Sequence, residues 1–509
     1  MSVQDADSRR LRVLGISSML LYAALAAFFW TAWSFKNHWI DQVFILVATG
    51  ALVILYFSGI KFARNAAVSA IVTFAIAMAI VGFIMPPFDS TDVFFYMAAG
   101  WQQAHYGGNP YSRLLRNVAG ASDDPMIQNA WMARNRNPWL DIPMPYGFLF
   151  ALLARGLAWI GGGNFWRTLC LVKCLNLLMH AGTALFLWKS SKCLPQANGK
   201  AILYLYSWNP FVVLQYLVDS HNDIIVAFLV VLAAYFLLKD RPLWSLPLLV
   251  AAGLVKYVTL VLVPFAFIFL IRQKGWREGV RGLLISIGMV MATAAPFAAE
   301  YASFKYRLIW VQLSDSTGSL HAFIVYSFRA LARMWPVLLV SVSSFGLVTK
   351  AGLWIVFTIF VLRQLYVSWR EPEEEAVTMI QRWTSIMFVL IFVASSQFFA
   401  WYLGMILPLA LLTHRKKILA DCVIALSGAH MLSFTFLRRK AIGYFVVATL
   451  IPILYLVTQN CWLRVRAPLG PWKSSSLFKK TCRFRRDSST RTGPARNAGP
   501  AYTVQVRRK

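Results

Sequence analysis

The 509-residue chain is 59% hydrophobic and only 14% charged, and its mean hydropathy is +0.58. A soluble protein of this length could not bury so much apolar surface, so a soluble nucleic-acid-binding protein is excluded despite the net charge of +30. The 50 Lys and Arg lie mainly between apolar segments and in the tail, as expected for cytosolic loops. The sequence therefore predicts an all-α polytopic membrane protein with no nucleic-acid partner.

The first apolar run, Val13 to Trp33, follows a cluster of arginines. It is too long for the apolar core of a cleaved signal peptide, so we expect an uncleaved first span and a cytosolic N-terminus. The next spans are predicted at 41–60 and 66–85, with basic residues between them. The segment after the third span should therefore lie outside the cytosol.

The stretch from Phe88 to about Arg167 is rich in Gly, Asn, Pro and aromatic residues and is too long for a simple connection. Amphipathic pieces at Val93 to His105 and Pro145 to Trp159 predict helices that lie along the membrane surface. If residues 146–160 crossed the membrane, the lysines that follow the next span would lie outside, against the charge rule. We therefore expect residues 88–167 to form a long extracytoplasmic loop with juxtamembrane helices, in which residues 146–160 lie at the membrane surface or form a re-entrant segment.

Later apolar segments bring the predicted total to about 12–14 spans, several of them shorter than the ~20 residues that a straight span needs. The basic residues at 438–440 conflict with the charge rule, which leaves open the orientation of the last hairpin in the membrane. The topology of the segment 322–348 is also left open. Residues 464–509 are strongly basic and predict a disordered cytosolic tail that could meet anionic lipid headgroups, after a transmembrane domain of residues 1–463. The later spans are predicted at 169–188, 201–218, 223–238, 243–256, 258–271, 280–298, 351–367, 382–397, 398–413, 418–436 and 442–460.

Polar residues gather at the ends of apolar segments on the side opposite the basic loops. Asp89 and Asp92 follow the third span in a chain with only 20 acidic residues, and an acid at the membrane edge is more often functional than incidental. The other candidates on this face are His221, Asn222, Asp223, Lys256, Tyr96, Asn109, Tyr111, Arg329, Arg333, Gln397, Trp401 and Tyr402.

Each candidate also has a purely structural interpretation. Asp89 or Asp92 could cap the helix predicted from Val93, and Asp223 could cap the span that follows it. Taken singly, none of these residues identifies a site. The remaining alternatives are an interfacial position for the Lys256 ammonium, for Trp401 and for Tyr402, and a solvated helix face for Arg329 and Arg333.

Carboxylates beside cations outside the membrane suit a reaction between a lipid-linked phosphate and a hydroxyl. A carboxylate can accept the proton of the attacking hydroxyl, and cations can neutralise the departing phosphate. Such a leaving group requires no metal, although Asp89, Asp92 and Asp223 could coordinate Mg²⁺ or Mn²⁺. The six cysteines show no CxxC spacing and predict neither a disulfide framework nor a zinc site. The main alternative, a flippase or other transporter, would place charges near the midplane of the membrane.

Four motifs occur in order between about residues 85 and 415. They are Ser90 to Tyr96 with Gly108-Asn109-Pro110-Tyr111, then Trp208-Asn209-Pro210 with His221-Asn222-Asp223, then Ala252 to Lys256, and finally Ser396 to Leu403 with Leu407-Pro408-Leu409. Together they resemble bacterial GT-C glycosyltransferases, especially the polyprenol-phosphate-mannose-dependent mannosyltransferases. The chain departs from that pattern at Ala400, where the family usually has proline.

The resemblance implies an inverting enzyme of a bacterial inner membrane that transfers a hexose, with mannose expected. Its donor would be a polyprenyl-phosphate sugar, and its acceptor a glycan or glycolipid. Asp92 matches the base in the family's first outer loop, whereas Asp89 has no confident counterpart and is assigned a helper role. Lys256, aided by Arg329 or Arg333, would hold the donor phosphate. His221 and Asp223 would bind substrate hydroxyls or shield the leaving group.

Overall fold

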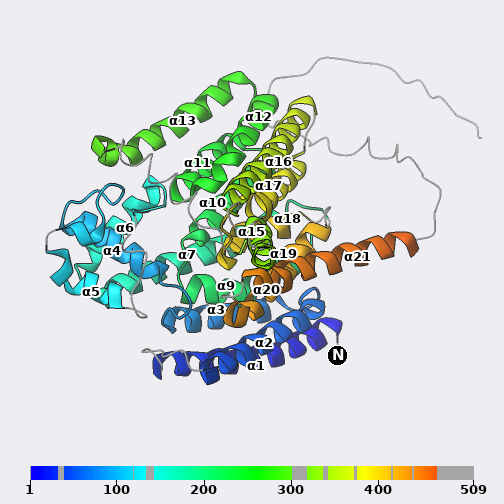
Figure 1. Cartoon of the computed structure of the whole chain (residues 1–509). Helices are drawn as coiled ribbons and strands as arrows, with labels where there is room; N and C mark the ends of the chain where they lie inside the picture. The colour runs from blue at the N-terminus through cyan, green and yellow to red at the C-terminus, as the bar shows by residue number, and fades with distance from the viewer. Residues whose placement is uncertain are drawn as a thin grey trace, which may run out of the picture. The chain divides into compact units, whose positions relative to one another are not determined.

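The computed structural model describes residues 2–31, 39–118, 120–132, 143–195, 197–300, 318–335, 342–371, 375–413, 417–437 and 441–466. These described residues form helices joined by turns and contain no β-strand, so the fold is all-α, as predicted (Figure 1). Residues 1–460 form one compact unit, which holds every candidate site residue. Most of the basic tail, the segment 301–317 and the basic residues at 414–416 and 438–440 lie outside the described residues, so the predictions for them stay untested.

Seven helices of the described part are long and apolar enough to cross a membrane, which confirms a multi-pass membrane protein. An eighth span would be a pair of helices with a bend of 45° between them. The bend follows from the sequence, because Pro210 cannot continue the hydrogen bonding of the preceding helix and the Asn209 side chain caps the new one. The long helices are α1 (Val3–Thr31), α2 (Trp39–Ala63), α7 (Phe165–Ser191), η6 with α12 (Tyr257–Leu262, Val263–Lys274), α13 (Trp276–Ala294), α16 (Val342–Arg370) and α17 with η9 (Ala376–Val389, Leu390–Ala394), and the bent pair is α8 (Gly199–Ser207) with α9 and η4 (Pro210–Val212, Val213–Val218).

Several further apolar helices have only 10–17 residues in their apolar stretch, fewer than the ~20 that a straight span needs. Every predicted span overlaps an apolar helix or a run of adjoining helices in the described part of the chain, and the number that crosses the membrane stays a prediction. The segment 322–348, which the sequence pattern leaves unassigned, contains most of α15 (Leu320–Met334). The shorter helices are α3 (Val68–Ile84), α10 (Asp223–Leu238), α11 (Ser245–Val255), α18 (Leu403–Leu412), α19 (Lys417–Leu437), and α20, η12 and α21 (Ala441–Phe445, Val446–Leu450, Ile451–Arg466).

The described part of the segment between α3 and α7 contains the α-helices α4 (Asp92–His105), α5 (Pro125–Met132) and α6 (Phe148–Gly161), besides two short 3₁₀ helices, and α4 packs against both α5 and α6 (Figure 1). The predicted helices at 93–105 and 145–159 are thus present, with their ends shifted by at most three residues. Every residue from Asp92 to Gly100 is buried, so α4 is enclosed by protein rather than exposed along one polar face. The first turn of α4 is therefore held firmly inside the molecule.

The close approach of α4 and α6 requires glycine at position 100. A Cβ atom there would lie 2.3 Å from the carbonyl oxygen of Ala154. Gly100→Ala should force the two helices apart and lower the free energy of unfolding by about 1–3 kcal/mol. The thermal unfolding midpoint of the solubilised protein measures this change.

Gly156→Ala on α6 is the matched control, because a Cβ atom there would meet nothing within 4 Å. It should leave the midpoint unchanged or raise it, since alanine favours a helix over glycine by up to about 1 kcal/mol. Equal midpoints for the two variants would show that the α4–α6 contact does not limit stability.

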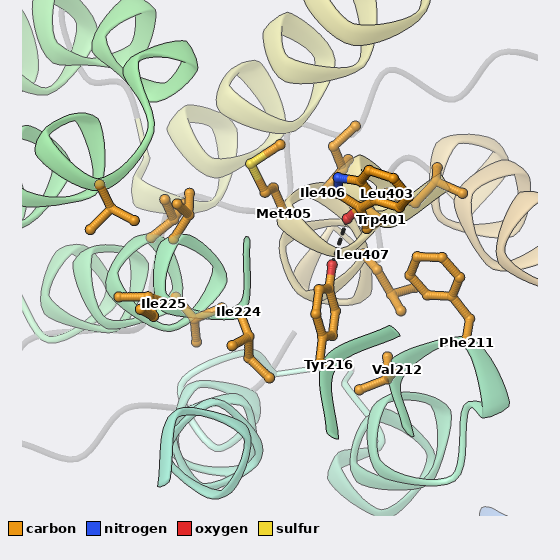
Figure 2. Packing of buried hydrophobic residues seen from close by; sticks show 14 of the residues in the cluster. Phe211, Val212, Tyr216, Ile224, Ile225, Trp401, Leu403, Met405, Ile406 and Leu407 are labelled. Carbon is orange, nitrogen blue, oxygen red and sulfur yellow. Dashed lines mark hydrogen bonds between the residues drawn. The ribbon is translucent and has the colours of Figure 1, made fainter. Parts of the chain in front are cut away.

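The core beneath the site joins the bent pair to α10 and α18 (Figure 2). The Tyr216 hydroxyl, at the end of the bent pair, donates a hydrogen bond of 2.7 Å to the Trp401 carbonyl oxygen. Gly404 makes room for this bond, because a Cβ atom at that position would overlap the Tyr216 hydroxyl. The contact fixes the segment before α18 against η4.

Candidate active site

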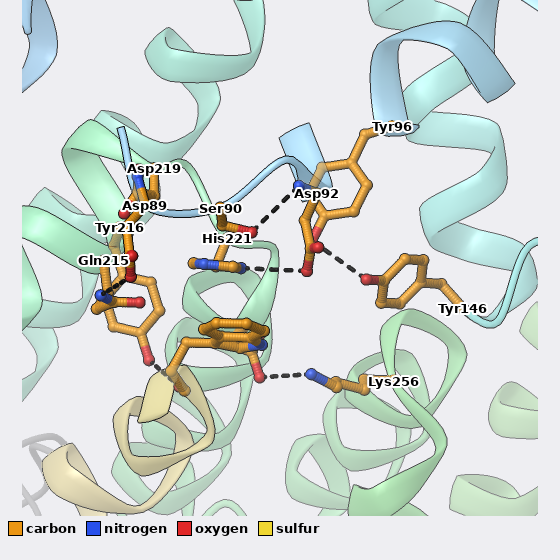
Figure 3. A network of polar contacts seen from close by, with 12 residues as sticks. Asp89, Ser90, Asp92, Tyr96, Tyr146, Gln215, Tyr216, Asp219, His221 and Lys256 are labelled. Carbon is orange, nitrogen blue, oxygen red and sulfur yellow. Dashed lines mark hydrogen bonds and ion pairs between the residues drawn. The ribbon is translucent and has the colours of Figure 1, made fainter. Parts of the chain in front are cut away.

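Asp92 is the first residue of α4 and is 7% exposed. Its backbone N–H donates to the Ser90 hydroxyl at 3.1 Å, and the helix N-cap is Thr91 without a side-chain capping bond. The interpretation of Asp89 or Asp92 as the cap of this helix is therefore wrong. The Asp92 carboxylate instead faces His221, whose Nδ1 lies 3.5 Å from Asp92 Oδ2 (Figure 3).

His221 lies in the short turn between η4 and α10. Ser220 precedes it with φ +60°, a left-handed conformation that costs a non-glycine residue of order 1 kcal/mol and often occurs at functional sites. The His221 ring is fully buried and stacks on Trp401, with centroids 4.0 Å apart and planes at 14°. The turn and the stack together hold His221 next to Asp92.

Trp401 is held between two rings. Phe399 stacks nearly parallel to the indole, with ring centroids 4.7 Å apart, and His221 stacks on it at 4.0 Å. Two rings this close to the indole would collide on the same face, so they lie on opposite faces. Trp401 is also only 4% exposed. Both faces of its indole are thus covered by protein, and one of them lies against the His221 ring.

Lys256 and Asp223 form a second, buried pair. Lys256 follows the C-terminus of α11 in an extended conformation, and its Nζ lies 2.7 Å from Asp223 Oδ1. The ammonium also lies 4.0 Å from the centre of the Tyr402 ring, a cation–π distance. Asp223 is fully buried, and its Oδ2 has no hydrogen-bond partner in the described part of the chain. The N-cap of α10 is Asn222, so the proposed capping role of Asp223 is wrong.

Two tyrosines border the Asp92 carboxylate. The hydroxyls of Tyr96 and Tyr146 lie 3.3 Å apart, and Tyr146 was not among the predicted residues. Burial raises the pKa of both phenols well above the usual range, and the negative charge of Asp92 raises each pKa further. Both hydroxyls are therefore neutral at physiological pH and can donate or accept hydrogen bonds.

Three other predicted residues have contacts that shape loops. Asn109 Oδ1 accepts from the Tyr111 backbone N–H at 3.0 Å, and the Tyr111 hydroxyl donates to the Tyr146 carbonyl oxygen at 2.9 Å. The half-buried Gln397 accepts from the Ser395 hydroxyl through its carbonyl oxygen. Tyr111 thus holds the backbone of Tyr146, and Asn109 holds the backbone of Tyr111.

Asp89 lies apart from Asp92, beside Asp219 and Gln215 (Figure 3). Its backbone N–H donates to Asp219 Oδ1 at 2.9 Å, and its Oδ2 accepts from Gln215 at 3.5 Å. The structure thus separates the two carboxylates that the sequence placed together.

Arg329 and Arg333 are exposed on α15, and the described contacts do not join them to Asp92 or Lys256. The cap of this helix, Ser319, donates to the Ser396 carbonyl oxygen. Arg329 lies ten residues beyond Ser319, which places it about 15 Å along the helix axis from that contact. Among the described residues, no three His, Cys, Asp or Glu side chains form a candidate metal site.

Fold and site define a polytopic α-helical membrane protein with a buried cluster of acids, histidine and lysine at helix ends. Residues 13–272, just over half of the chain, match the family model described as alpha-(1->6)-mannopyranosyltransferase, N-terminal domain. The chain belongs to this family, and the match contains Asp92, His221, Asp223 and Lys256.

Two curated relatives carry related names. An alpha-(1->6)-mannopyranosyltransferase of Mycobacterium tuberculosis is 26% identical over 167 residues, which are 32% of this chain and 26% of that protein. A probable alpha-(1->6)-mannopyranosyltransferase of Mycolicibacterium smegmatis is 25% identical over 171 residues, 32% of this chain and 29% of that protein. The chain therefore covers less than a third of either relative's length. No solved structure matches the chain.

Proposed function

We propose that this protein transfers mannose from a polyprenyl-phosphate donor to a hydroxyl of a glycan or glycolipid, with inversion at the anomeric carbon. The reaction takes place at the extracytoplasmic face of a bacterial inner membrane, with both termini of the chain in the cytosol. The observation that carries the proposal is the pairing of Asp92 with His221 beside the Lys256–Asp223 ion pair. Membership of the mannopyranosyltransferase family supports the choice of sugar.

In the proposed mechanism Asp92 accepts the proton of the acceptor hydroxyl. The hydroxyl oxygen then bonds to the anomeric carbon as the bond from that carbon to the phosphate oxygen breaks, and its electron pair stays on the polyprenyl phosphate. Lys256, whose side chain is 12% exposed, neutralises this developing charge. His221 orients Asp92, and Asp223 orients the ammonium of Lys256.

The neutral hydroxyls of Tyr96 and Tyr146 suit recognition of the acceptor. They lie beside Asp92, where the hydroxyl to be deprotonated must come within about 3 Å of the carboxylate. A phenol in this position can bind a neighbouring sugar hydroxyl without competing for the proton. Acceptor recognition is thus assigned to the first outer segment, and donor phosphate recognition to Lys256.

The purified protein in lipid nanodiscs, supplied with synthetic polyprenyl-phosphate mannose and a short mannoside, tests this function. We expect one polyprenyl phosphate to be released for each mannose transferred. GDP-mannose, a water-soluble donor, should not replace the lipid donor. Efficient use of GDP-mannose would contradict the proposed donor, and movement of the lipid donor across the bilayer without product would favour a transporter.

Trp401→Ala should slow transfer by about 10–100-fold, because His221 loses the ring that fixes its position and small displacements at a reaction centre are costly. Initial rates at saturating donor and acceptor measure the change. Trp159→Ala, which removes an indole that is 71% exposed on α6, is the matched control and should keep the full rate. Equal rates for the two variants would refute the orienting role of Trp401.

A further inference from the structure

Lys173 on α7 is a buried cation that the proposed mechanism does not use. It is 4% exposed, and four backbone carbonyl oxygens lie within hydrogen-bonding distance of its Nζ. Two of them end α3 and its following turn, Gly82 at 3.2 Å and Met85 at 2.9 Å. The other two, at Leu217 and Val218, end η4. A single ammonium thus joins the ends of two helices.

These two helix ends lead into the two segments that form the site. Met85 comes shortly before Asp89 and Asp92, and Val218 shortly before His221 and Asp223. The last carbonyls of a helix lack partners within it and carry partial negative charge, so a cation placed between two such ends stabilises both. Lys173 therefore links the helix end at Met85 to the helix end at Val218, from which the two segments start.

Two further side chains tie the same segments together. Asp219, which is fully buried, accepts through Oδ1 from the backbone N–H groups of Phe88 at 2.8 Å and Asp89 at 2.9 Å. Its charge also interacts electrostatically with Lys173. Asn176, one turn further along α7, donates to the carbonyl oxygens of Tyr216 at 3.0 Å and His221 at 3.2 Å.

We propose that Lys173 is a positioning residue that holds the segment carrying Asp92 against the turn carrying His221. The inference rests on the proposed role of Asp92 as the base. Lys173 acts through the backbone and touches no reacting atom, since its ammonium is surrounded by main-chain oxygens. Substitution should therefore slow the transfer step while leaving the donor KM, which depends on Lys256, within about threefold of the wild-type value.

Amide hydrogen–deuterium exchange tests the structural half of this proposal without any substrate. In Lys173→Met, amides of residues 86–92 and 217–223 should exchange at least tenfold faster, and those of α13 should not change. Lys189→Met, on the exposed part of the same helix, is the matched control and should alter neither segment. Unchanged exchange in both segments of Lys173→Met would overturn the proposal, even if the protein proved not to transfer mannose.

Kinetics test the functional half. Lys173→Met should reduce kcat by about 100-fold, the effect of a displacement near 1 Å at a reaction centre. In an Asp92→Asn background the same substitution should cause less than a threefold further loss, because no base remains to be positioned. A full 100-fold further loss there would reveal general structural damage and overturn the proposal. If Lys173→Met does not fold, Asn176→Leu should show the same pattern with smaller changes.

Discussion

Asp92→Asn should reduce the rate of mannose transfer by about 10²–10⁴-fold, the usual contribution of a general base. Asparagine has nearly the same shape as aspartate, and its side-chain oxygen can still face His221, but it cannot take the proton of the acceptor hydroxyl. Because Asp92 does not touch Lys256, the donor KM should stay within about threefold of its wild-type value. Release of polyprenyl phosphate under saturating substrates measures the rate.

Asp123→Asn is the matched control, since Asp123 is an exposed acid of the same outer segment. We expect it to transfer mannose at the wild-type rate. Asp89→Asn should lower the transfer rate only a few-fold. The Asp89 side chain accepts a hydrogen bond from Gln215, and its backbone N–H donates to Asp219, so both contacts lie away from Asp92. If Asp92→Asn kept full activity while Asp89→Asn lost it, the base would be Asp89 rather than Asp92.

Lys256→Met should raise the donor KM by about 30-fold or more. Removing one partner of a buried, hydrogen-bonded charge pair costs at least about 2 kcal/mol, and here the loss also removes the proposed phosphate ligand. The substitution also leaves the buried Asp223 carboxylate without its cation, and this uncompensated negative charge repels the donor phosphate. Initial rates across a range of donor concentrations in nanodiscs measure the change in KM.

Lys274→Met is the matched control, because Lys274 and Asp240 form an ion pair of the same length, 2.7 Å, at the protein surface. It should leave the donor KM unchanged, as exposed pairs contribute little. The double variant Lys256→Met with Asp223→Asn separates two effects: neutralising Asp223 should restore stability without restoring donor binding. Recovery of the wild-type KM in the double variant would show that Lys256 only balances Asp223.

Hydrophobic patterning predicted most of the fold. The third span, expected at 66–85, is α3 (Val68–Ile84), and the helix expected from Val93 begins one residue earlier. Long apolar runs bounded by charges reveal helices directly, because length and composition determine whether a segment can be buried in a bilayer. The π-helical ends Val213–Val218 and Leu390–Ala394 could not be predicted, since they follow from tertiary contacts rather than from periodicity.

The arrangement of the candidate site was predicted in part. Asp92, His221, Asp223 and Lys256 were identified by their type and position, and the structure brings them together in two adjacent pairs. Sequence could not show that Trp401 is enclosed between two rings, because an interfacial and a buried tryptophan look alike within an apolar run.

Lys173 and Tyr146 were missed for a related reason. A single lysine inside the predicted span 169–188 gave no sign of its partners, which are main-chain carbonyls more than 40 residues away in sequence. Tyr146 comes two residues before α6 and acquires its place beside Asp92 only through the contact of α4 with α6. Arg329 and Arg333 show the opposite case: suitable chemistry in the sequence, but exposed positions on α15.

Donor binding and transfer, measured separately in one preparation, test the central claim most directly. A fluorescent polyprenyl-phosphate mannose gives Kd by titration, and rapid mixing of the preformed complex with acceptor gives the rate of a single turnover. We expect Asp92→Asn to bind the donor within about threefold of wild type but to transfer about 10²-fold or more slowly. Lys256→Met should lose binding instead. Single-turnover transfer by Asp92→Asn at the wild-type rate would contradict the role of Asp92 as the base.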